Sequence, residues 1–158
     1  MEILKDIGFD YIQNHESELM KKTINGLKRI RGMHELHLYG DNVHYDDRVG
    51  IIVFNVGRLS SGHVSEVLAE QYAIAVRHGK FCSHPYVNRL ITGRSGAGCL
   101  QNGMIRISFG IYTSGDEVNS FLKAVERIAW GKADTVSAMS GKAVLAARLG
   151  IRRPGDRG

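Results

Sequence analysis

The segment RHGKFCSHP, residues 77–85, places Cys82 among four basic or potentially basic side chains. Cysteine is a nucleophile only as its thiolate, and nearby positive charge favours that form. A glycine and a proline frame the cysteine on a loop, from which its side chain could reach a substrate. The same residues also fit a small, half-buried cysteine beside a solvated basic loop, and the residues alone leave both interpretations open. The four basic side chains are Arg77, His78, Lys80 and His84.

A second candidate for chemistry is Arg106, in the segment MIRISFGIY at residues 104–112. Apolar residues alternate along this segment, which is typical of a strand with one buried face, and Arg106 falls on the other face. Arginine presents a planar fork of donors that matches a carboxylate in two hydrogen bonds. An arginine projecting from a strand into a cleft could therefore anchor a substrate carboxylate. An exposed strand arginine without a ligand is the alternative.

Two further patterns predict less. Residues 92–103 (TGRSGAGCLQNG) are as rich in glycine as phosphate-binding loops, but they lack the Gly-Lys-Ser/Thr ending and follow no clear strand, which favours a plain loop. Cys82 and His84 have C-x-H spacing with no second cysteine pair, a poor pattern for zinc. We therefore assign no metal-binding and no cofactor-binding residue to this chain.

Hydrophobic periodicity predicts the elements that position these residues. Their order predicts an α+β, two-layer domain with a mixed or antiparallel sheet that helices cover on one face. We expect this domain to span residues 1–131 and residues 132–158 to form a weakly helical tail with a frayed basic end. The expected elements are helices at about 5–31, 62–72 and 114–130, strands at 36–39, 48–56, 74–77 and 104–112, and a helical turn at 84–91.

The composition is that of an ordinary globular protein. The 158 residues are 43% hydrophobic and 23% charged, which suits one domain with one core. The net charge of +5 is mild and does not alternate with aromatic residues, so we interpret it as solvated surface and expect no nucleic-acid partner. Two cysteines form no disulfide framework, which favours the cytoplasm. We expect no membrane partner, because no apolar run reaches the roughly 20 residues of a membrane helix.

Three segments in this order and spacing resemble the C-terminal part of class V aminotransferases. They are RVGIIVFNV (48–56), YAIAVRHGKFCSHP (72–85) and IRISFGIYTS (105–114). This family consists of pyridoxal-phosphate enzymes and includes cysteine desulfurases and selenocysteine lyases. The resemblance covers roughly residues 6 to 130 and implies the small, C-terminal domain of a fold type I pyridoxal-phosphate enzyme.

The resemblance implies three residue roles. Arg106 aligns with the arginine that holds the α-carboxylate of the amino-acid substrate. Cys82 aligns with the cysteine that, in desulfurases, attacks the sulfur of the substrate and becomes a persulfide. Arg77 lies where the family has an arginine lining the same loop. Desulfurases of this type often have two histidines before the cysteine, whereas this chain has Lys80 and Phe81, so desulfurase, transaminase and epimerase chemistry all stay open.

The resemblance also implies a partner. The family binds its cofactor through a lysine that follows a histidine in the large domain, and none of the seven histidines here precedes a lysine. We therefore expect pyridoxal phosphate in the complete enzyme, none bound to this chain alone, and no turnover by the chain alone. The expected partners are a large domain, from the same gene or a separate chain, an amino-acid substrate and further copies in a homo-oligomer. The alternative is a non-catalytic interaction module, or gene remnant, that pairs with another chain.

Overall fold

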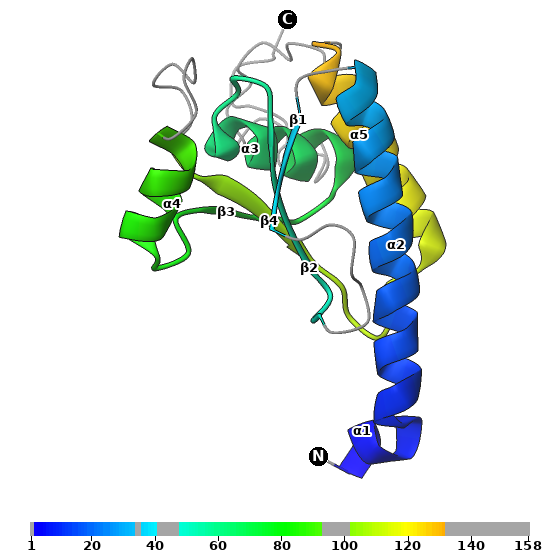
Figure 1. Cartoon of the computed structure of the whole chain (residues 1–158). Helices are drawn as coiled ribbons and strands as arrows, with labels where there is room; N and C mark the ends of the chain where they lie inside the picture. The colour runs from blue at the N-terminus through cyan, green and yellow to red at the C-terminus, as the bar shows by residue number, and fades with distance from the viewer. Residues whose placement is uncertain (1, 34–35, 41–47, 93–101, 132–158) are drawn as a thin grey trace, which may run out of the picture.

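The computed structural model describes residues 2–33, 36–40, 48–92 and 102–131 of the chain (Figure 1). The expected tail at 132–158 and most of the glycine-rich segment 92–103, including Cys99, lie outside the described residues. The helices are α1 (Glu2–Ile7), α2 (Phe9–Met33), α3 (Ser61–Tyr72), α4 (His84–Thr92) and α5 (Gly115–Ala129), and the strands are β1 (Leu36–Tyr39), β2 (Ile51–Val56), β3 (Arg77–Gly79) and β4 (Met104–Ser108).

The four strands form one sheet in the order β1-β2-β4-β3, and every neighbouring pair is antiparallel. This arrangement confirms the α+β class and the antiparallel option for the sheet. Since β2 and β3 both pair antiparallel with β4, they run parallel to each other, and α3 links them. The strand expected at 74–77 instead begins at Arg77, because Ala73 ends α3 in a left-handed conformation and residues 74–76 are used to return the chain to the sheet.

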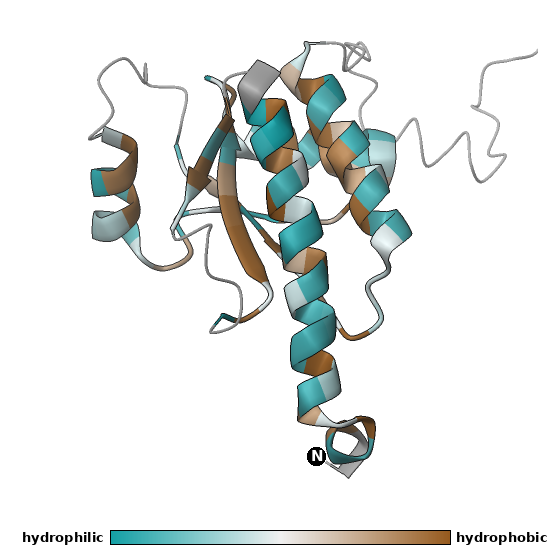
Figure 2. Ribbon diagram, turned by 45° about the vertical axis from the view of Figure 1, so that its right-hand side comes forward, coloured by the Kyte–Doolittle hydropathy of each residue, from teal (hydrophilic) through white to brown (hydrophobic). Residues whose placement is uncertain are grey.

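Three helices, α2, α3 and α5, cover one face of the sheet. The strands contribute alternate residues to this side, and Phe54 meets Phe121 of α5 edge to face with ring centroids 5.8 Å apart. Figure 2 shows α2 and α5 side by side, each with hydrophobic and hydrophilic residues interleaved as in amphipathic helices. The close approach needs Gly26, where a Cβ would lie 2.4 Å from Cδ1 of Leu122. The buried strand residues are Leu36, Leu38, Ile52, Phe54, Val56, Ile105 and Ile107.

The short helix α4 packs on the opposite face. Its buried Val87 and Ile91 form a second apolar cluster with Met104 of β4. The sequence predicts helices on one face only, with a helical turn at 84–91. The structure instead has a full nine-residue helix on the other face, which stands apart from the three main helices in Figure 1. Its two buried residues are four apart, which gives the short helix one apolar stripe.

The long N-terminal helix departs from the expected single helix over 5–31. Gly8 has φ +90, which breaks the chain into α1 and α2, and α2 then continues to Met33. Its N-terminal half extends beyond the sheet in Figure 1. There, Nε2 of His15 lies 2.9 Å from the carbonyl oxygen of Thr113, and Gly50 N donates to Glu16 Oε2 at 3.0 Å. These contacts join the helix to the turns at the ends of β2 and β4.

Candidate functional site

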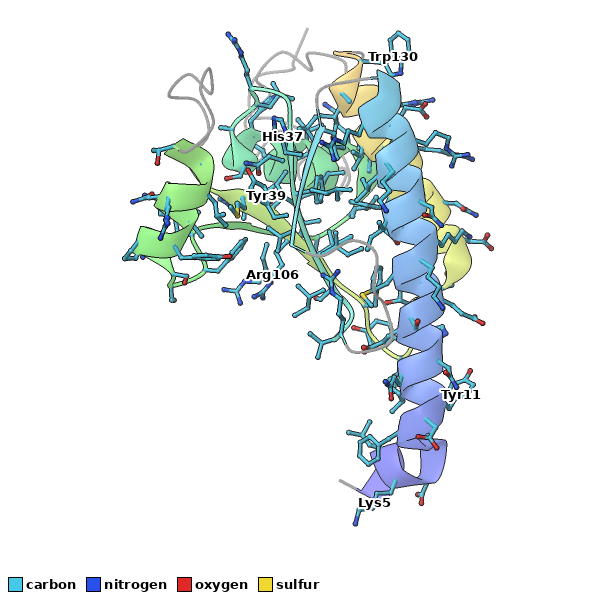
Figure 3. All side chains as sticks on the ribbon, viewed as in Figure 1. Lys5, Tyr11, His37, Tyr39, Arg106 and Trp130 are labelled. Atoms are coloured by element: carbon cyan, nitrogen blue, oxygen red, sulfur yellow. The ribbon has the colours of Figure 1, made fainter. Side chains whose placement is uncertain are left out.

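A row of four side chains crosses the sheet on the face away from α2, α3 and α5. The strand register pairs Tyr39 with Val53, Val53 with Arg106, and Arg106 with Arg77. Residues directly opposite each other on neighbouring strands point to the same face. The row therefore brings together two of the residues singled out from the sequence, Arg106 and Arg77. Arg106 projects from the sheet on the side away from α3 (Figure 3).

The two arginines place two positive charges on this face of the sheet. Arg106 is half-buried and Arg77 is exposed, and the paired positions put two like charges directly opposite each other, which costs stability. The four strands and the described segment 77–92 contain no aspartate or glutamate. A bound anion would relieve the repulsion between the guanidinium groups. A carboxylate suits this position because arginine can hold it with two parallel hydrogen bonds.

Cys82 is exposed on the turn between β3 and α4, beside this row. Ser83 N donates to the carbonyl oxygen of Lys80 at 2.8 Å, which closes the turn, and Phe81 and Cys82 adopt left-handed conformations with φ 51 and φ 60. The Arg106 Cζ atom lies 5.2 Å from the centroid of the Phe81 ring. Because Phe81 precedes Cys82 directly, the turn places the cysteine next to the arginine row.

Two glycines fix the base of this turn. A Cβ on Gly103 would lie 2.6 Å from the Cα of Gly79, so β3 and β4 approach more closely there than any side chain allows. Gly79 itself has φ +109, a conformation that favours glycine. The approach occurs one residue before Lys80, where the cysteine turn begins. The sequence indicates only that a glycine frames the cysteine loop, and the contact of Gly79 with Gly103 could not be predicted because it joins two separate segments of the chain.

Asn55 supports the same region from β2. It is 1% exposed, and its Nδ2 donates to the carbonyl oxygen of Gly103 at 3.1 Å and to the Tyr39 hydroxyl at 3.4 Å. It thereby ties the start of β4 to the row of side chains. Sequence reasoning missed Asn55 as a supporting residue. The available signal was one amide in the otherwise apolar strand segment IIVFNV, since a buried amide in such a strand needs hydrogen-bond partners.

Other residues noted in the sequence lie elsewhere. The His78 ring faces α3, where it is the nearest neighbour to a Cβ added at Gly62, and the exposed His84 begins α4. In the parts of the chain that the structure describes, no group of three or more His, Cys, Asp and Glu side chains could hold a metal ion. Over the same residues, no helix has the length and apolar character needed to cross a membrane.

Comparison with known proteins gives a consistent set of similarities. Residues 1–121 match the family described as "Aminotransferase class-V". A probable cysteine desulfurase of Pyrococcus abyssi is 34% identical over 125 residues, which are 79% of this chain and 27% of that protein. A probable cysteine desulfurase of Synechocystis is 31% identical over 126 residues, 80% of this chain and 27% of that protein. The chain thus spans about a quarter of the length of these curated relatives.

Solved structures agree with the sequence matches. The apo structure of a cysteine desulfurase from Thermococcus onnurineus NA1 superposes with a TM-score of 0.65 at 31% identity, over 80% of this chain and 28% of that one. A cysteine desulfurase from Escherichia coli superposes with a TM-score of 0.62, over 80% of this chain and 27% of that one. Its identity of 21% makes it a match of fold alone.

Proposed function

Because this chain belongs to the class V aminotransferase family, we propose that it forms the substrate-facing C-terminal domain of a pyridoxal-phosphate enzyme of the cysteine desulfurase type. The observation that carries the proposal is that Cζ of Arg106, half-buried on the sheet face opposite the main helices, lies 5.2 Å from the ring centroid of Phe81, the residue directly before the exposed Cys82. The two curated relatives described above, which are both named as probable cysteine desulfurases, are 34% and 31% identical to this chain. We take residues 1–131 as the domain that contributes to the active site.

Arg106 anchors the α-carboxylate of the amino-acid substrate in this proposal. Its guanidinium group sits on a rigid strand rather than a loop, so its position is well defined. Arg77, on the neighbouring strand, adds positive charge to the same anion. Charge-assisted hydrogen bonds of this kind are worth about 1.5–3 kcal/mol when partly buried, enough to orient a small substrate.

Cys82 accepts the sulfur atom. Its thiolate attacks the sulfur of substrate cysteine, forming an S–S bond as the carbon–sulfur bond breaks, so the acceptor becomes a persulfide and the amino-acid carbon receives the electron pair. Pyridoxal phosphate, when bound, supplies the electron sink for that pair. The chain's own contribution is the nucleophile, exposed on a turn that follows the anchoring row.

The residues of this chain fit the substrate and not the cofactor. Among the described lysines, Lys80 alone lies outside α1, α2 and α5, and it follows a glycine, unlike the family's cofactor lysine, which follows a histidine. We therefore assign cofactor binding to a large domain outside this chain, supplied by the same gene or by a separate chain. We also propose that the complete enzyme is a homo-oligomer.

A chimera tests this function. Residues 1–131 would replace the matching segment of the Pyrococcus abyssi protein, and visible absorbance of lysine-bound cofactor and sulfide release from L-cysteine would be measured. We expect the chimera to bind pyridoxal phosphate and release sulfide. We expect Cys82→Ala to keep the cofactor absorbance and lose sulfide release, and Arg106→Gln to raise KM for L-cysteine.

The isolated chain provides the opposite control. Mixed with pyridoxal phosphate and L-cysteine, it should show neither the absorbance of lysine-bound cofactor nor sulfide release. Turnover by the isolated chain would overturn the assignment of the cofactor to another domain. Unchanged sulfide release in the Cys82→Ala chimera would remove Cys82 from the mechanism and leave a transaminase or epimerase role for Arg106.

A second candidate function is a non-catalytic module that pairs with another chain. Several large apolar side chains are exposed on the projecting N-terminal helices and the adjoining turns, and exposed apolar surface of this kind is typical of protein contacts. This candidate predicts a chimera that folds and binds the cofactor but releases no sulfide with Cys82 and Arg106 in place, whereas the catalytic proposal predicts sulfide release. These side chains are Phe9, Tyr11, Val49 and Tyr112.

A further inference from the structure

Phe81 makes a contact that the proposed chemistry does not use. Its ring is half-buried and packs with the apolar cluster between α4 and the sheet, while the Arg106 Cζ atom lies 5.2 Å from its centroid. A guanidinium group at this distance is attracted by the negative face of the ring. The Phe81 ring therefore contacts both the apolar cluster at α4 and the arginine proposed to bind substrate. The buried cluster consists of Val87, Ile91 and Met104.

An arginine in contact with an aromatic ring can still bind an anion, because its guanidinium group carries five N–H donors in one plane. An arginine side chain has many rotamers, so a ring against its face reduces the freedom that must be lost when a carboxylate binds. The attraction also offsets repulsion by Arg77 on the neighbouring strand.

Phe81, whose ring contacts Arg106, is the residue directly before Cys82. Phe81 and Cys82 are consecutive residues with left-handed φ values of 51 and 60, and the Lys80–Ser83 hydrogen bond closes the turn around them. Because both residues belong to one tight turn, the backbone of that turn sets the directions in which the Phe81 and Cys82 side chains leave it. A guanidinium group held against the Phe81 ring therefore lies near the residue that carries the thiol.

We infer that Phe81 is a positioning residue, which holds the Arg106 guanidinium beside Cys82 so that anionic reactants reach the thiolate in preference to neutral ones. The inference rests on the proposed function of Arg106 as an anion anchor. In this inference, the aromatic ring of Phe81 determines the charge selectivity of the site.

Competing alkylation of the full chain tests the inference. In a Cys99→Ser background, Cys82 is the one remaining cysteine, and its rates of reaction with iodoacetate and iodoacetamide give a ratio that reports charge selectivity. A change in thiolate content or exposure alters both rates alike and leaves the ratio unmoved, so a merely structural role would not change it. We expect Phe81→Leu to lower the ratio about threefold, the scale of an exposed cation–π contact.

The controls separate this inference from the proposed function. Phe81→Tyr should keep the ratio, because the ring face is retained, and Tyr86→Leu should also keep it, because Tyr86 is an exposed aromatic residue of α4. Arg106→Gln should lower the ratio at least as much as Phe81→Leu. An unchanged ratio in Arg106→Gln would overturn the anion-anchor function itself. A lowered ratio in Arg106→Gln with an unchanged ratio in Phe81→Leu would overturn only the role of Phe81.

A second measurement observes the Arg106 side chain directly. A guanidinium held over an aromatic ring has side-chain protons shifted upfield by the ring current, and NMR of the wild-type chain can observe this shift for Arg106. An upfield shift that is retained in Phe81→Tyr supports the inference. Arg106 protons at ordinary frequencies would overturn it.

Discussion

The two faces of the sheet differ, because one forms the buried apolar core and the other carries charged side chains. Toward α2, α3 and α5, alternate strand residues form a continuous apolar core in which Phe54 and Ile105 are fully buried. On the other face, β4 and β3 present Arg106 and Arg77, and the turn after β3 carries the exposed Cys82. One strand, β4, contributes to both, so the neighbouring residues Ile105 and Arg106 lie in the core on one side and at the candidate site on the other. Because side chains alternate between the two faces of a strand, a single strand can supply core residues to one face and candidate-site residues to the other.

The largest expected effect is on the core face. Phe54→Ala removes a fully buried ring that meets Phe121 edge to face, so we expect it to lower the free energy of unfolding by about 3–5 kcal/mol. Urea denaturation followed by circular dichroism measures this change. Val53→Ala, one residue away and half-buried on the other face, is the matched control and should cost clearly less. Equal costs at the two positions would contradict the division between the faces.

The next effect concerns the base of the cysteine turn. Gly103→Ala places a Cβ 2.6 Å from the Gly79 Cα, and backbone must move to accept it, so we expect a loss of about 1–3 kcal/mol. The alkylation rate of Cys82 should change with it, because the turn starts next to Gly79. Gly115→Ala is the control, since its added Cβ meets only the flexible end of Lys22. A Gly103→Ala chain with wild-type stability and Cys82 reactivity would show that the close approach does not hold the turn.

A smaller effect tests the core-side helices. Ser114 and Glu117 form a capping box at the start of α5, with Glu117 N donating to Ser114 Oγ at 3.2 Å and Ser114 N donating to Glu117 Oε2 at 2.7 Å. We expect Ser114→Ala to cost about 1 kcal/mol in the same denaturation experiment. Ser60→Ala removes the cap of α3, where His63 N donates to Ser60 Oγ, and should cost no more. A larger loss of stability for Ser60→Ala than for Ser114→Ala would contradict this expectation, which rests on the two reciprocal hydrogen bonds of the capping box at α5.

The smallest expected effect is a gain in stability, and it concerns the sheet face that carries Arg106 and Arg77. Arg77→Gln removes one of two like charges at paired strand positions, so we expect it to stabilise the chain by about 0.2–0.5 kcal/mol at low salt. The gain should shrink as salt is raised, because exposed charges are screened. Denaturation at two salt concentrations measures both. Destabilisation by Arg77→Gln at low salt would mean that the pairing of Arg77 with Arg106 does not lower the stability of the chain.

Periodicity predicted the core side of the fold and part of the site. The strand at 36–39, the helix at 62–72 and the helix at 114–130 are confirmed closely, because each carries a clear apolar period and the last two have serine caps. The placement of Arg106 on the face away from the main helices also agrees with the alternation of its strand. The functional roles of Arg106, Arg77 and Cys82 stay predictions that the experiments above address.

Long-range contacts could not be predicted from one sequence. The pairing of Arg106 with Arg77 depends on strand order and register, which are set by packing across the whole sheet. The same holds for the ring of Phe81 under Arg106 and for the contact between Gly79 and Gly103. Local chemistry explains the other differences. The strand expected at 104–112 ends at Ser108, because Thr113 N donates to the Gly110 carbonyl oxygen and turns the chain there.

The length of β3 has a consequence for how the chain behaves among its neighbours. This strand lies at one border of the sheet, where unpaired backbone groups can recruit a strand from another molecule. It has only three residues, it carries the charged Arg77, and Gly79 leaves the extended conformation at its end. A border so short and so charged gives little template for intermolecular strand addition. The strand that carries Arg77 therefore also discourages aggregation of this domain.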